Sequence, residues 1–507
     1  MSVDAQAGPD TAQQGPPVPH PGATATLWDG AGAAIATAPA PAGAPAAFPT
    51  GTRTRHHPAD LHPSSGRSRW IYDWDPEDET FWRERGARVA RRNLTFSILA
   101  EYIGFSIWTM WSTLVLFLGP KYGLNPAQKF TLVSVAAGCG SVLRLPYTFA
   151  VATFGGRNWT IVSAALLLVP CFLTATLLEP GVGYSTLLLL AAVGGVGGGN
   201  FASSMTNINA FYPNRLKGWA LGLNAAGGNL GVATMQLVGL LVLATAGVNH
   251  PRMVLAIYVP LIVVGMLGAA LFMDNLGHLS NDKRAMRDVC RDNHTWVMSF
   301  LYIGTFGSFI GFGFAFGMVL QVQFADQFTT PIKAAHLTFL GPLIGSLARP
   351  IGGFLADRLG GARVTFVNFM AMAGSALTVL IASKQHSLQL FLIGFISLFV
   401  FSGLGNGSTY KMIPAIFKAK ADIAIAGGAA KDVAAAYTRR MSGALIGIAG
   451  AIGAFGGVLV NIAFRQSFLH TKSGDAAYLT FVIFYGLCFL VTWTVYLRPS
   501  KNRLTGV

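Results

Sequence analysis

Long apolar stretches dominate this chain and restrict its fold more than any other feature. Of 507 residues, 52% are hydrophobic, 11% are charged and 60 are glycine. Predominantly apolar runs of roughly 18 residues or more recur along the chain, and each is long enough to cross a bilayer as a helix. Strands of a membrane barrel are shorter and alternate polar with apolar residues. We therefore expect an all-α membrane protein.

The apolar pattern predicts twelve transmembrane helices. Their expected positions are 94–118, 128–154, 158–179, 184–211, 217–245, 252–273, 296–324, 337–357, 364–383, 388–416, 441–464 and 477–497. They form two bundles of six, at 94–273 and 296–497, joined by a charged cytoplasmic linker at 274–295. Residues 498–507 are the expected cytoplasmic C-terminus.

The first part of the chain differs sharply from the rest. Residues 1–66 are rich in Ala, Pro and Gly, and such a composition buries too little surface to fold. We expect a disordered cytoplasmic tail there, followed by a cytoplasmic segment at 67–93 that leads into the first span. An apolar core followed by a small-residue cleavage site is absent, so a signal peptide is not indicated.

Basic residues lie mainly in short loops on one side of the predicted membrane. The formal net charge is +15, but no basic patch or stripe typical of nucleic-acid binding is present. Cytoplasmic loops of membrane proteins carry an excess of Lys and Arg. The distribution therefore predicts that both termini are cytoplasmic, and it indicates a lipid bilayer rather than nucleic acid as the surrounding partner.

Two arginines interrupt the apolar spans at matched places. Gly140-Ser141-Val142-Leu143-Arg144 in the second span corresponds to Gly345-Ser346-Leu347-Ala348-Arg349 in the eighth. A charge at bilayer depth costs at least about 2.5–3.5 kcal/mol on insertion scales, and it is retained where it has a partner or a function. Arg144 and Arg349 are therefore the first candidates for a functional site.

Two further matches recur at nearly the same offset. Phe154-Gly155-Gly156-Arg157 corresponds to Leu359-Gly360-Gly361-Ala362-Arg363, and Gly199-Asn200 in the fourth span corresponds to Gly405-Asn406 in the tenth. Secondary transporters often consist of two such repeats around a site near the middle of the membrane. We expect the two bundles to be pseudo-symmetric.

Charge balance at this depth favours a bound anion. Glu101 is the one acidic residue expected inside a span. Two guanidinium groups in a low-dielectric environment repel each other unless something negative lies between them, and a planar guanidinium suits a flat oxyanion. As an alternative, Glu101 neutralises one arginine and backbone carbonyls cap the other.

Glycines gather in the fifth and eleventh spans. Small residues at helical spacing allow two helix backbones to approach closely, and in a transporter the same surfaces can slide. Tight packing alone is the alternative explanation. The residues concerned are Gly227, Gly228, Gly231, Gly450, Gly453 and Gly457. Asn229 lies among them, at a place where a ligand can approach the backbone.

Motifs for other chemistry are missing from the sequence. The four cysteines are isolated, and no metal-binding spacing, cofactor motif or nucleophile–base arrangement is found. We therefore expect neither an enzyme nor a cofactor, and no metal site. All ten histidines fall in the tail, in loops or at helix ends, which leaves Glu101 as the candidate proton carrier.

Several motifs resemble those of the major facilitator superfamily and, within it, the bacterial nitrate/nitrite porters of the NarK type. The superfamily loop motif corresponds to the run from Gly352 to Arg363. The porter-specific resemblance rests on Leu143–Tyr147, Asn200–Met205, Gly222–Gly231, Tyr302–Phe312 and Gly403–Thr409. It extends from about Trp70 to Arg498 and leaves out the tail.

The resemblance implies the major facilitator fold and a particular site. The substrates would be nitrate and nitrite, and the protein would be a monomer in the bacterial inner membrane. The residues that the resemblance assigns to the site are Arg144, Arg349, Asn229, Tyr302, Phe105, Phe201 and Phe306. The glycines of the fifth and eleventh spans would match the two nitrate signatures of the family.

The expected activity is nitrate/nitrite exchange by alternating access. Glu101 departs from the pattern of exchanger-type relatives, which have an apolar residue at this position, so proton-coupled nitrate symport through Glu101 is an alternative. An anion-binding membrane sensor is a further alternative, although the sequence lacks a recognisable signalling domain.

Overall fold

The computed structural model describes residues 69–277, 279, 282–499, 504 and 506–507. The helical body lies within the unit Phe48–Val507. The expected disordered tail at 1–66 lies outside the described residues.

Twelve helices within the described residues are long and apolar enough to cross a membrane. In the first half they comprise α2 (Ala87–Trp108), α3 (Met110–Phe117), α4 (Pro126–Phe154), α5 (Gly156–Leu166), α6 (Leu168–Leu177), α7 (Tyr184–Gly194), η4 (Gly195–Gly199), α8 (Asn200–Phe211), α9 (Asn214–Thr245) and α10 (Arg252–Phe272). In the second half they comprise α12 (Asn293–Tyr302), η5 (Ile303–Gly307), α13 (Ser308–Gln323), α14 (Pro331–Thr338), α15 (Leu340–Leu359), α16 (Gly361–Lys384), α17 (Leu388–Ala426), α18 (Lys431–Thr471), α19 (Asp475–Thr492) and η6 (Trp493–Leu497).

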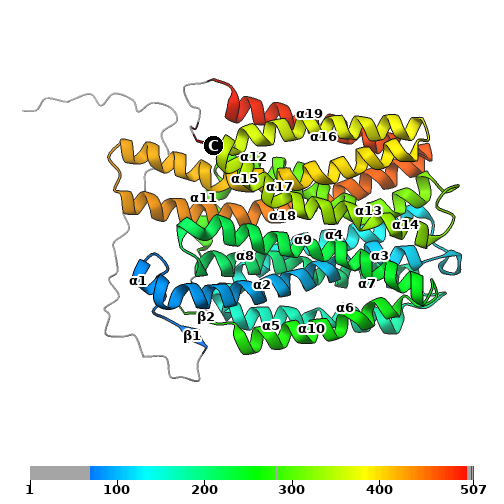
Figure 1. Ribbon diagram of the computed structural model, residues 1–507, viewed down its shortest axis with the longest axis horizontal. Coiled ribbons are helices and arrows are strands. Elements are labelled where there is room, and N and C mark those ends of the chain that lie inside the picture. The colour runs from blue at the N-terminus through cyan, green and yellow to red at the C-terminus, as the bar shows by residue number, and fades with distance from the viewer. Residues whose placement is uncertain (1–68, 278, 280–281, 500–503, 505) are drawn as a thin grey trace, which may run out of the picture. The chain divides into compact units, whose positions relative to one another are not determined.

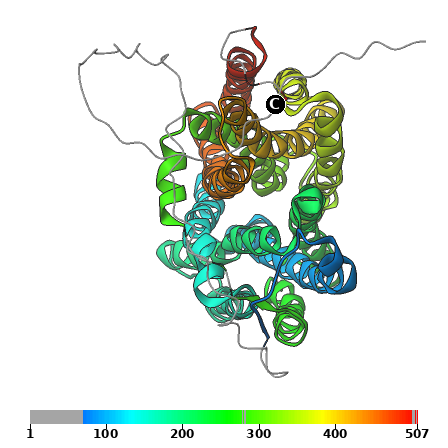
Figure 2. The same cartoon turned by 90° about the vertical axis from the view of Figure 1, so that its left-hand side faces the viewer.

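The two halves pack in the same way, which confirms the predicted pair of six-helix bundles. In the first half α2 packs on α9, α4 on α8 and α5 on α10; in the second α13 packs on α18, α15 on α17 and α16 on α19. Figures 1 and 2 show the early helices on one side of the body and the late helices on the other. Contacts of α4 with α18 and of α9 with α15 join the halves.

Several helices continue beyond the spans expected from apolarity. The tenth ends at Ala426 rather than at 416, and the eleventh begins at Lys431 rather than at 441. The added turns carry charged residues such as Lys418 and Arg439, so hydropathy does not detect them, although nothing stops the helix there. In Figure 1 these ends of α17 and α18 project together beyond the other helices.

Short elements gather at the end of the body from which α17 and α18 project, and we call this the linker end. They are β1 (Trp70–Ile71), α1 (Glu79–Phe81), η2 (Trp82–Gly86), β2 (Asn275–Leu276) and α11 (Lys283–Cys290); η3 (Pro120–Tyr122) lies in a loop. β1 and β2 pair in parallel, with Trp70 opposite Asn275. This two-strand ribbon fastens the linker to the segment before the first span, a contact that the sequence analysis did not predict.

The repeated glycine before each arginine has a structural reason. A Cβ on Gly198 would lie 2.6 Å from Cα of Gly140, and a Cβ on Gly403 would lie 2.0 Å from the carbonyl oxygen of Gly345. The second span therefore crosses the fourth, and the eighth crosses the tenth, at backbone contact. Arg144 and Arg349 follow one helical turn later, each beside the same neighbouring span.

Candidate functional site

Arg144 is completely buried and surrounded by aromatic rings. Its Cζ lies 5.7 Å from the ring centre of Phe105, 5.1 Å from Trp108, 4.4 Å from Phe201 and 4.8 Å from Phe306. The π-faces of these rings attract the cation. Because Phe306 belongs to the second half, the aromatic enclosure spans both bundles.

Backbone carbonyls satisfy part of the Arg144 guanidinium. Nε donates a hydrogen bond to the carbonyl of Gly198 at 3.2 Å, and Nη1 donates to the carbonyl of Gly450 at 2.8 Å. Nη2 is buried and has no hydrogen-bond partner among the described residues. Backbone carbonyls thus cap Arg144, as the alternative interpretation expects for one of the two arginines. They do not satisfy Nη2, which keeps unused donor capacity.

Arg349 occupies the corresponding place in the second half, with an exposure of 3%. Its Nη2 donates to the Tyr302 hydroxyl at 3.4 Å, and its Cζ lies 5.8 Å from the ring centre of Tyr410. Nη1 is buried and has no partner in the part of the chain that the structure describes. Each arginine therefore keeps one unpaired nitrogen.

A stack of aromatic rings connects the two arginines. Tyr302 and Phe306 are stacked with ring centres 5.3 Å apart, and Phe306 and Phe201 are stacked at 5.9 Å. Tyr302 contacts Arg349 at one end of this stack, and Phe201 and Phe306 contact Arg144 at the other. Arg144 and Arg349, from opposite halves, therefore lie at one site in the centre of the body.

Glu101 lies beside this site and forms an ion pair with neither arginine. It is fully buried, and Oε2 accepts hydrogen bonds from the Ser204 hydroxyl and from Asn224 Nδ2, the latter at 2.5 Å. Among the described residues no arginine nitrogen lies within the 4.0 Å of an ion pair. Oε1 has no partner there either, and a Cβ on Gly228 would lie 2.3 Å from it. Glu101 interacts electrostatically with Arg349 and Arg144 without neutralising either directly.

Asn229 is buried with its whole amide unpaired. Neither Nδ2 nor Oδ1 has a hydrogen-bond partner within the described part of the chain. A buried amide without a partner costs about 1–3 kcal/mol, so such groups are rare unless a ligand uses them. Asn229 follows Gly228, whose missing side chain makes room for Glu101.

The predicted glycines divide into two structural groups. A Cβ on Gly227, Gly228, Gly231, Gly453 or Gly457 would lie between 2.2 and 2.9 Å from another atom, so each of these positions needs a glycine for close packing. Gly450 is different, because a Cβ there would lie 3.5 Å from Phe201 and 3.9 Å from Arg144 Nη1. Its carbonyl, rather than its lack of a side chain, serves the site.

Some residues of the site were missed by sequence reasoning. Trp108 lies one turn after Phe105 on the same helix face, and this spacing could have identified it. The carbonyls of Gly198 and Gly450 carry no side-chain signal at all. Tyr410 of the tenth span was not among the predicted site residues, yet its ring lies beside Arg349.

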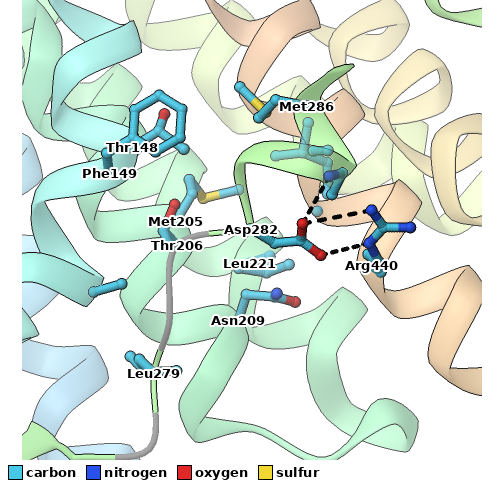
Figure 3. A pocket seen from close by; sticks show the side chains of 15 residues that line it. Thr148, Phe149, Met205, Thr206, Asn209, Leu221, Leu279, Asp282, Met286 and Arg440 are labelled. Atoms are coloured by element: carbon cyan, nitrogen blue, oxygen red, sulfur yellow. Dashed lines mark hydrogen bonds and ion pairs between the residues drawn. The ribbon is translucent and has the colours of Figure 1, made fainter. Parts of the chain in front are cut away.

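A cavity of about 160 Å³ leads toward Arg144 from the linker end. Figure 3 shows side chains of both halves around it, with Thr148 and Met205 on one side and Arg440 on the other. A smaller cavity of about 10 Å³ touches Arg144, Phe201 and Gly450. The two cavities share Met205, Thr206 and Ile446 in their walls, so these residues separate the larger cavity from the site.

An ionic cluster forms the outer wall of the larger cavity (Figure 3). Arg440 of α18 donates to Asp282 and, at 2.7 Å, to Asp288 of the linker helix α11. Partial burial by itself raises the pKa of the Asp282 carboxyl, but hydrogen bonds from Arg440 and the backbone N–H of Ala285 outweigh it and hold the pKa below its ordinary value. We call Arg440, Asp282 and Asp288 the linker clamp.

At the opposite end of the body the two halves touch directly. Gln236 Nε2 of α9 donates to the carbonyl of Gly313 at 2.6 Å, and Trp108 packs edge-on against Phe314 with ring centres 5.8 Å apart. A Cβ on Gly317 would lie 3.3 Å from Leu116 of the first half. These contacts join the two halves at the end opposite to the larger cavity.

The site contains cationic and aromatic groups rather than a metal-binding set. Within the described residues no group of three or more His, Cys, Asp or Glu side chains is close enough to hold a metal ion. Unpaired donors on two guanidinium groups and one amide, enclosed by aromatic rings, can bind a small planar anion.

Similar proteins of known name share most of the chain. The family model of the Major Facilitator Superfamily matches residues 94–430. The nitrate/nitrite transporter NarU of Salmonella typhimurium is 38% identical over 456 residues, which cover 85% of this chain and 97% of that protein. The probable nitrate/nitrite antiporter NarK2 of Thermus thermophilus is 33% identical over 87% of this chain and 99% of that protein.

Solved structures agree on the fold. The D-xylose–proton symporter superposes with a TM-score of 0.58 at 14% identity, covering 80% of this chain and 96% of that one. A point mutant of the nucleoside transporter NupG gives 0.55 at 12% identity, covering 79% and 99%. At such identities the likeness concerns the fold alone. Together with the sequence relatives, it shows that this chain is a multi-pass membrane protein of the major facilitator superfamily and belongs to its nitrate/nitrite porter family.

Proposed function

We propose that this protein exchanges nitrate for nitrite across the cytoplasmic membrane of a bacterium by alternating access. It would act as a monomer with both termini in the cytoplasm, and the linker end would face the cytoplasm. The names of the relatives support the substrate class. The observation that carries the proposal is the pair of buried arginines from opposite halves, each with one unpaired nitrogen at a shared aromatic site.

Recognition would use these unpaired donors. Nitrate and nitrite are small, planar and weakly hydrated, so a few well-placed donors and aromatic walls can replace their water. Arg144 Nη2, Arg349 Nη1 and Asn229 Nδ2 would donate to the anion oxygens. Phe201 and Phe306, stacked at 5.9 Å, would bound the anion's flat faces together with Phe105.

Charge would couple binding to reorientation. With Glu101 ionised, the empty site carries two positive charges and one negative charge, so a monovalent anion makes it neutral. Closing the two bundles around an uncompensated charge in a low-dielectric environment is unfavourable. Only the loaded carrier would therefore reorient readily, and this makes exchange the natural mode. The close-packed glycines Gly231, Gly453 and Gly457 would provide the surfaces that move.

Counterflow in proteoliposomes tests the proposal. Vesicles loaded with unlabelled nitrite should accumulate labelled nitrate from outside, and empty vesicles should not. Arg144→Lys should reduce this exchange strongly, because lysine keeps the charge but its donors sit on one nitrogen and lack the planar fork of the guanidinium. Exchange by Arg144→Lys at the wild-type rate would rule out recognition by the guanidinium fork. Binding without accumulation would indicate a sensor instead of a carrier.

Proton-coupled nitrate symport is the alternative. Glu101 favours testing it, because this carboxyl is buried and its Oε1 has no partner among the described residues. An imposed pH gradient should drive uptake into nitrite-free vesicles if protons are coupled, and should have no effect on a pure exchanger. Glu101→Gln is the matching variant, with Ser204→Ala as a control that removes a hydrogen bond but keeps the carboxyl. Gradient-driven uptake that Glu101→Gln abolishes would replace exchange by symport.

A further inference from the structure

Tyr410 is a half-buried tyrosine whose ring lies beside Arg349, and no role follows for it from the proposed site. It lies on α17, directly after Ser408 and Thr409. The neighbouring hydroxyls are occupied: Ser408 is 2.8 Å from Thr365 Oγ1, and Thr409 donates to the carbonyl of Gly405 at 2.7 Å. The Tyr410 hydroxyl is buried and has no hydrogen-bond partner in the described part of the chain.

The ring of Tyr410 lies beside the arginine of the second half and near Tyr302. Arg349 Cζ lies 5.8 Å from the Tyr410 ring centre, and the ring centres of Tyr410 and Tyr302 are 6.1 Å apart. Tyr302 in turn stacks on Phe306 with ring centres 5.3 Å apart, and the Phe306 ring centre lies 4.8 Å from Arg144 Cζ. The phenol therefore belongs to the same group of side chains as both arginines.

The two tyrosines beside Arg349 differ in what their hydroxyls do. The Tyr302 hydroxyl accepts from Arg349 Nη2 and so helps to orient the guanidinium. The Tyr410 hydroxyl leaves both its donor and its acceptor capacity unused. A buried hydroxyl without a partner is unfavourable, and a guanidinium offers no acceptor to it. An anion beside Arg349 Nη1 would supply that acceptor.

We propose that Tyr410 is a further anion-binding residue, whose hydroxyl donates a hydrogen bond to an oxygen of the nitrate or nitrite held by Arg349. This inference rests on the proposed function and adds a donor from the second half to the site. With it, the donors from the two halves are balanced: Arg144 and Asn229 from one, Arg349 and Tyr410 from the other. Closure around the anion would then require both bundles to contribute a charged and a neutral donor.

Tyr410→Phe is the direct test, because it removes one oxygen atom and keeps the ring beside Arg349. A hydrogen bond to a charged group contributes enough that its loss weakens binding by about tenfold or more. Nitrate and nitrite are titrated separately against purified protein in detergent. The dissociation constants of Tyr410→Phe should rise by about tenfold for both anions. The melting temperature of the anion-free variant should not fall, since the removed hydroxyl has no protein partner.

Tyr478→Phe is the matched control. Tyr478 of α19 also has a buried hydroxyl without a partner among the described residues, but it packs against Phe391 and Phe464, away from the arginines. Its variant should bind both anions like the wild type. Equal affinities for wild type and Tyr410→Phe would overturn this inference and leave the proposed function standing. If the wild type binds neither anion, both fail. A lower anion-free melting temperature with unchanged affinity would assign Tyr410 a structural role only.

Discussion

Two buried asparagines in the centre of this protein differ in their hydrogen bonding. Asn229 and Asn224 lie on the same helix and are both completely buried. Asn224 donates to Glu101 and to Ser204, whereas neither polar atom of the Asn229 side chain has a partner among the described residues. Asn224 is therefore part of the protein's own hydrogen-bond network, whereas the Asn229 amide is not, and we propose that it binds the anion.

Substituting these two asparagines by leucine should have opposite effects on stability. Asn229→Leu removes an unpaired amide that costs about 1–3 kcal/mol, so the melting temperature without anion should stay the same or rise. The added stability from nitrate should disappear. Asn224→Leu should lower the melting temperature, because the buried Glu101 carboxylate loses the hydrogen bond from Asn224. Thermal unfolding in detergent, with and without nitrate, measures both. A large loss of stability in Asn229→Leu would mean that its amide has a structural partner.

At the scale of helices, glycines set how closely the spans approach. A Cβ on Gly231 of α9 would lie 2.2 Å from the backbone carbonyl oxygen of Tyr102 in α2. A backbone atom cannot move away as a flexible side chain can. On the same helix, a Cβ on Gly222 would meet nothing within 4 Å. An alanine at Gly231 therefore tests close packing, whereas an alanine at Gly222 tests helix propensity alone.

Gly231→Ala should destabilise the protein by about 1–3 kcal/mol through overpacking, and it should slow exchange. Gly222→Ala should instead be neutral or stabilising by up to about 1 kcal/mol, because alanine is the better helix former. Gly450→Ala should fold normally, since its Cβ finds ordinary contact distances. Melting temperatures and counterflow rates of the three variants test this order. Equal tolerance at Gly231 and Gly222 would contradict close packing of α2 and α9.

Apolar periodicity and the arginine repeat were enough to predict most of the helical fold. Length and hydropathy identified the twelve spans, because each span must be apolar where it contacts lipid or the protein core. The ends of α17 and α18 were missed, since charged residues extend a helix without making it apolar. The β1–β2 ribbon was missed because two-residue strands have no periodicity.

The site was predictable in its charged groups but not in its geometry. Arg144, Arg349 and Glu101 are conspicuous as charges in apolar segments. Whether Glu101 pairs with an arginine depends on helix rotation, which the sequence leaves open; the structure gives it Ser204 and Asn224 instead. The role of the Gly450 carbonyl depends on contact between α4 and α18, far apart in the chain. The binding roles of Arg144, Arg349, Asn229 and the aromatic residues all stay predictions.

For the whole molecule, the linker clamp holds α11 against the second half. Because the pKa of Asp282 is lowered, its ion pair with Arg440 is present at neutral pH and is lost only in acid, as the pH falls through that lowered pKa. Amide hydrogen exchange of α11, corrected for its intrinsic pH dependence, should therefore be slower in the wild type than in Asp282→Asn at neutral pH. The two should converge in acid. A wild-type transition near neutrality would exclude this assignment.

The two ends of the body should differ in access to a water-soluble reagent. The cavity at the linker end is lined by Asn209, whereas Leu116, at the far end, is 5% exposed and faces Gly317 of the other half. In a Cys290→Ser background, which removes the one exposed cysteine among the described residues, Asn209→Cys and Leu116→Cys report on the two ends. An impermeant maleimide should label Asn209→Cys from the cytoplasmic face of inside-out vesicles. Leu116→Cys should react slowly from the periplasmic face, and added nitrate should accelerate it, because the loaded carrier reorients. Labelling of Asn209→Cys from the periplasmic face alone would reverse the proposed topology.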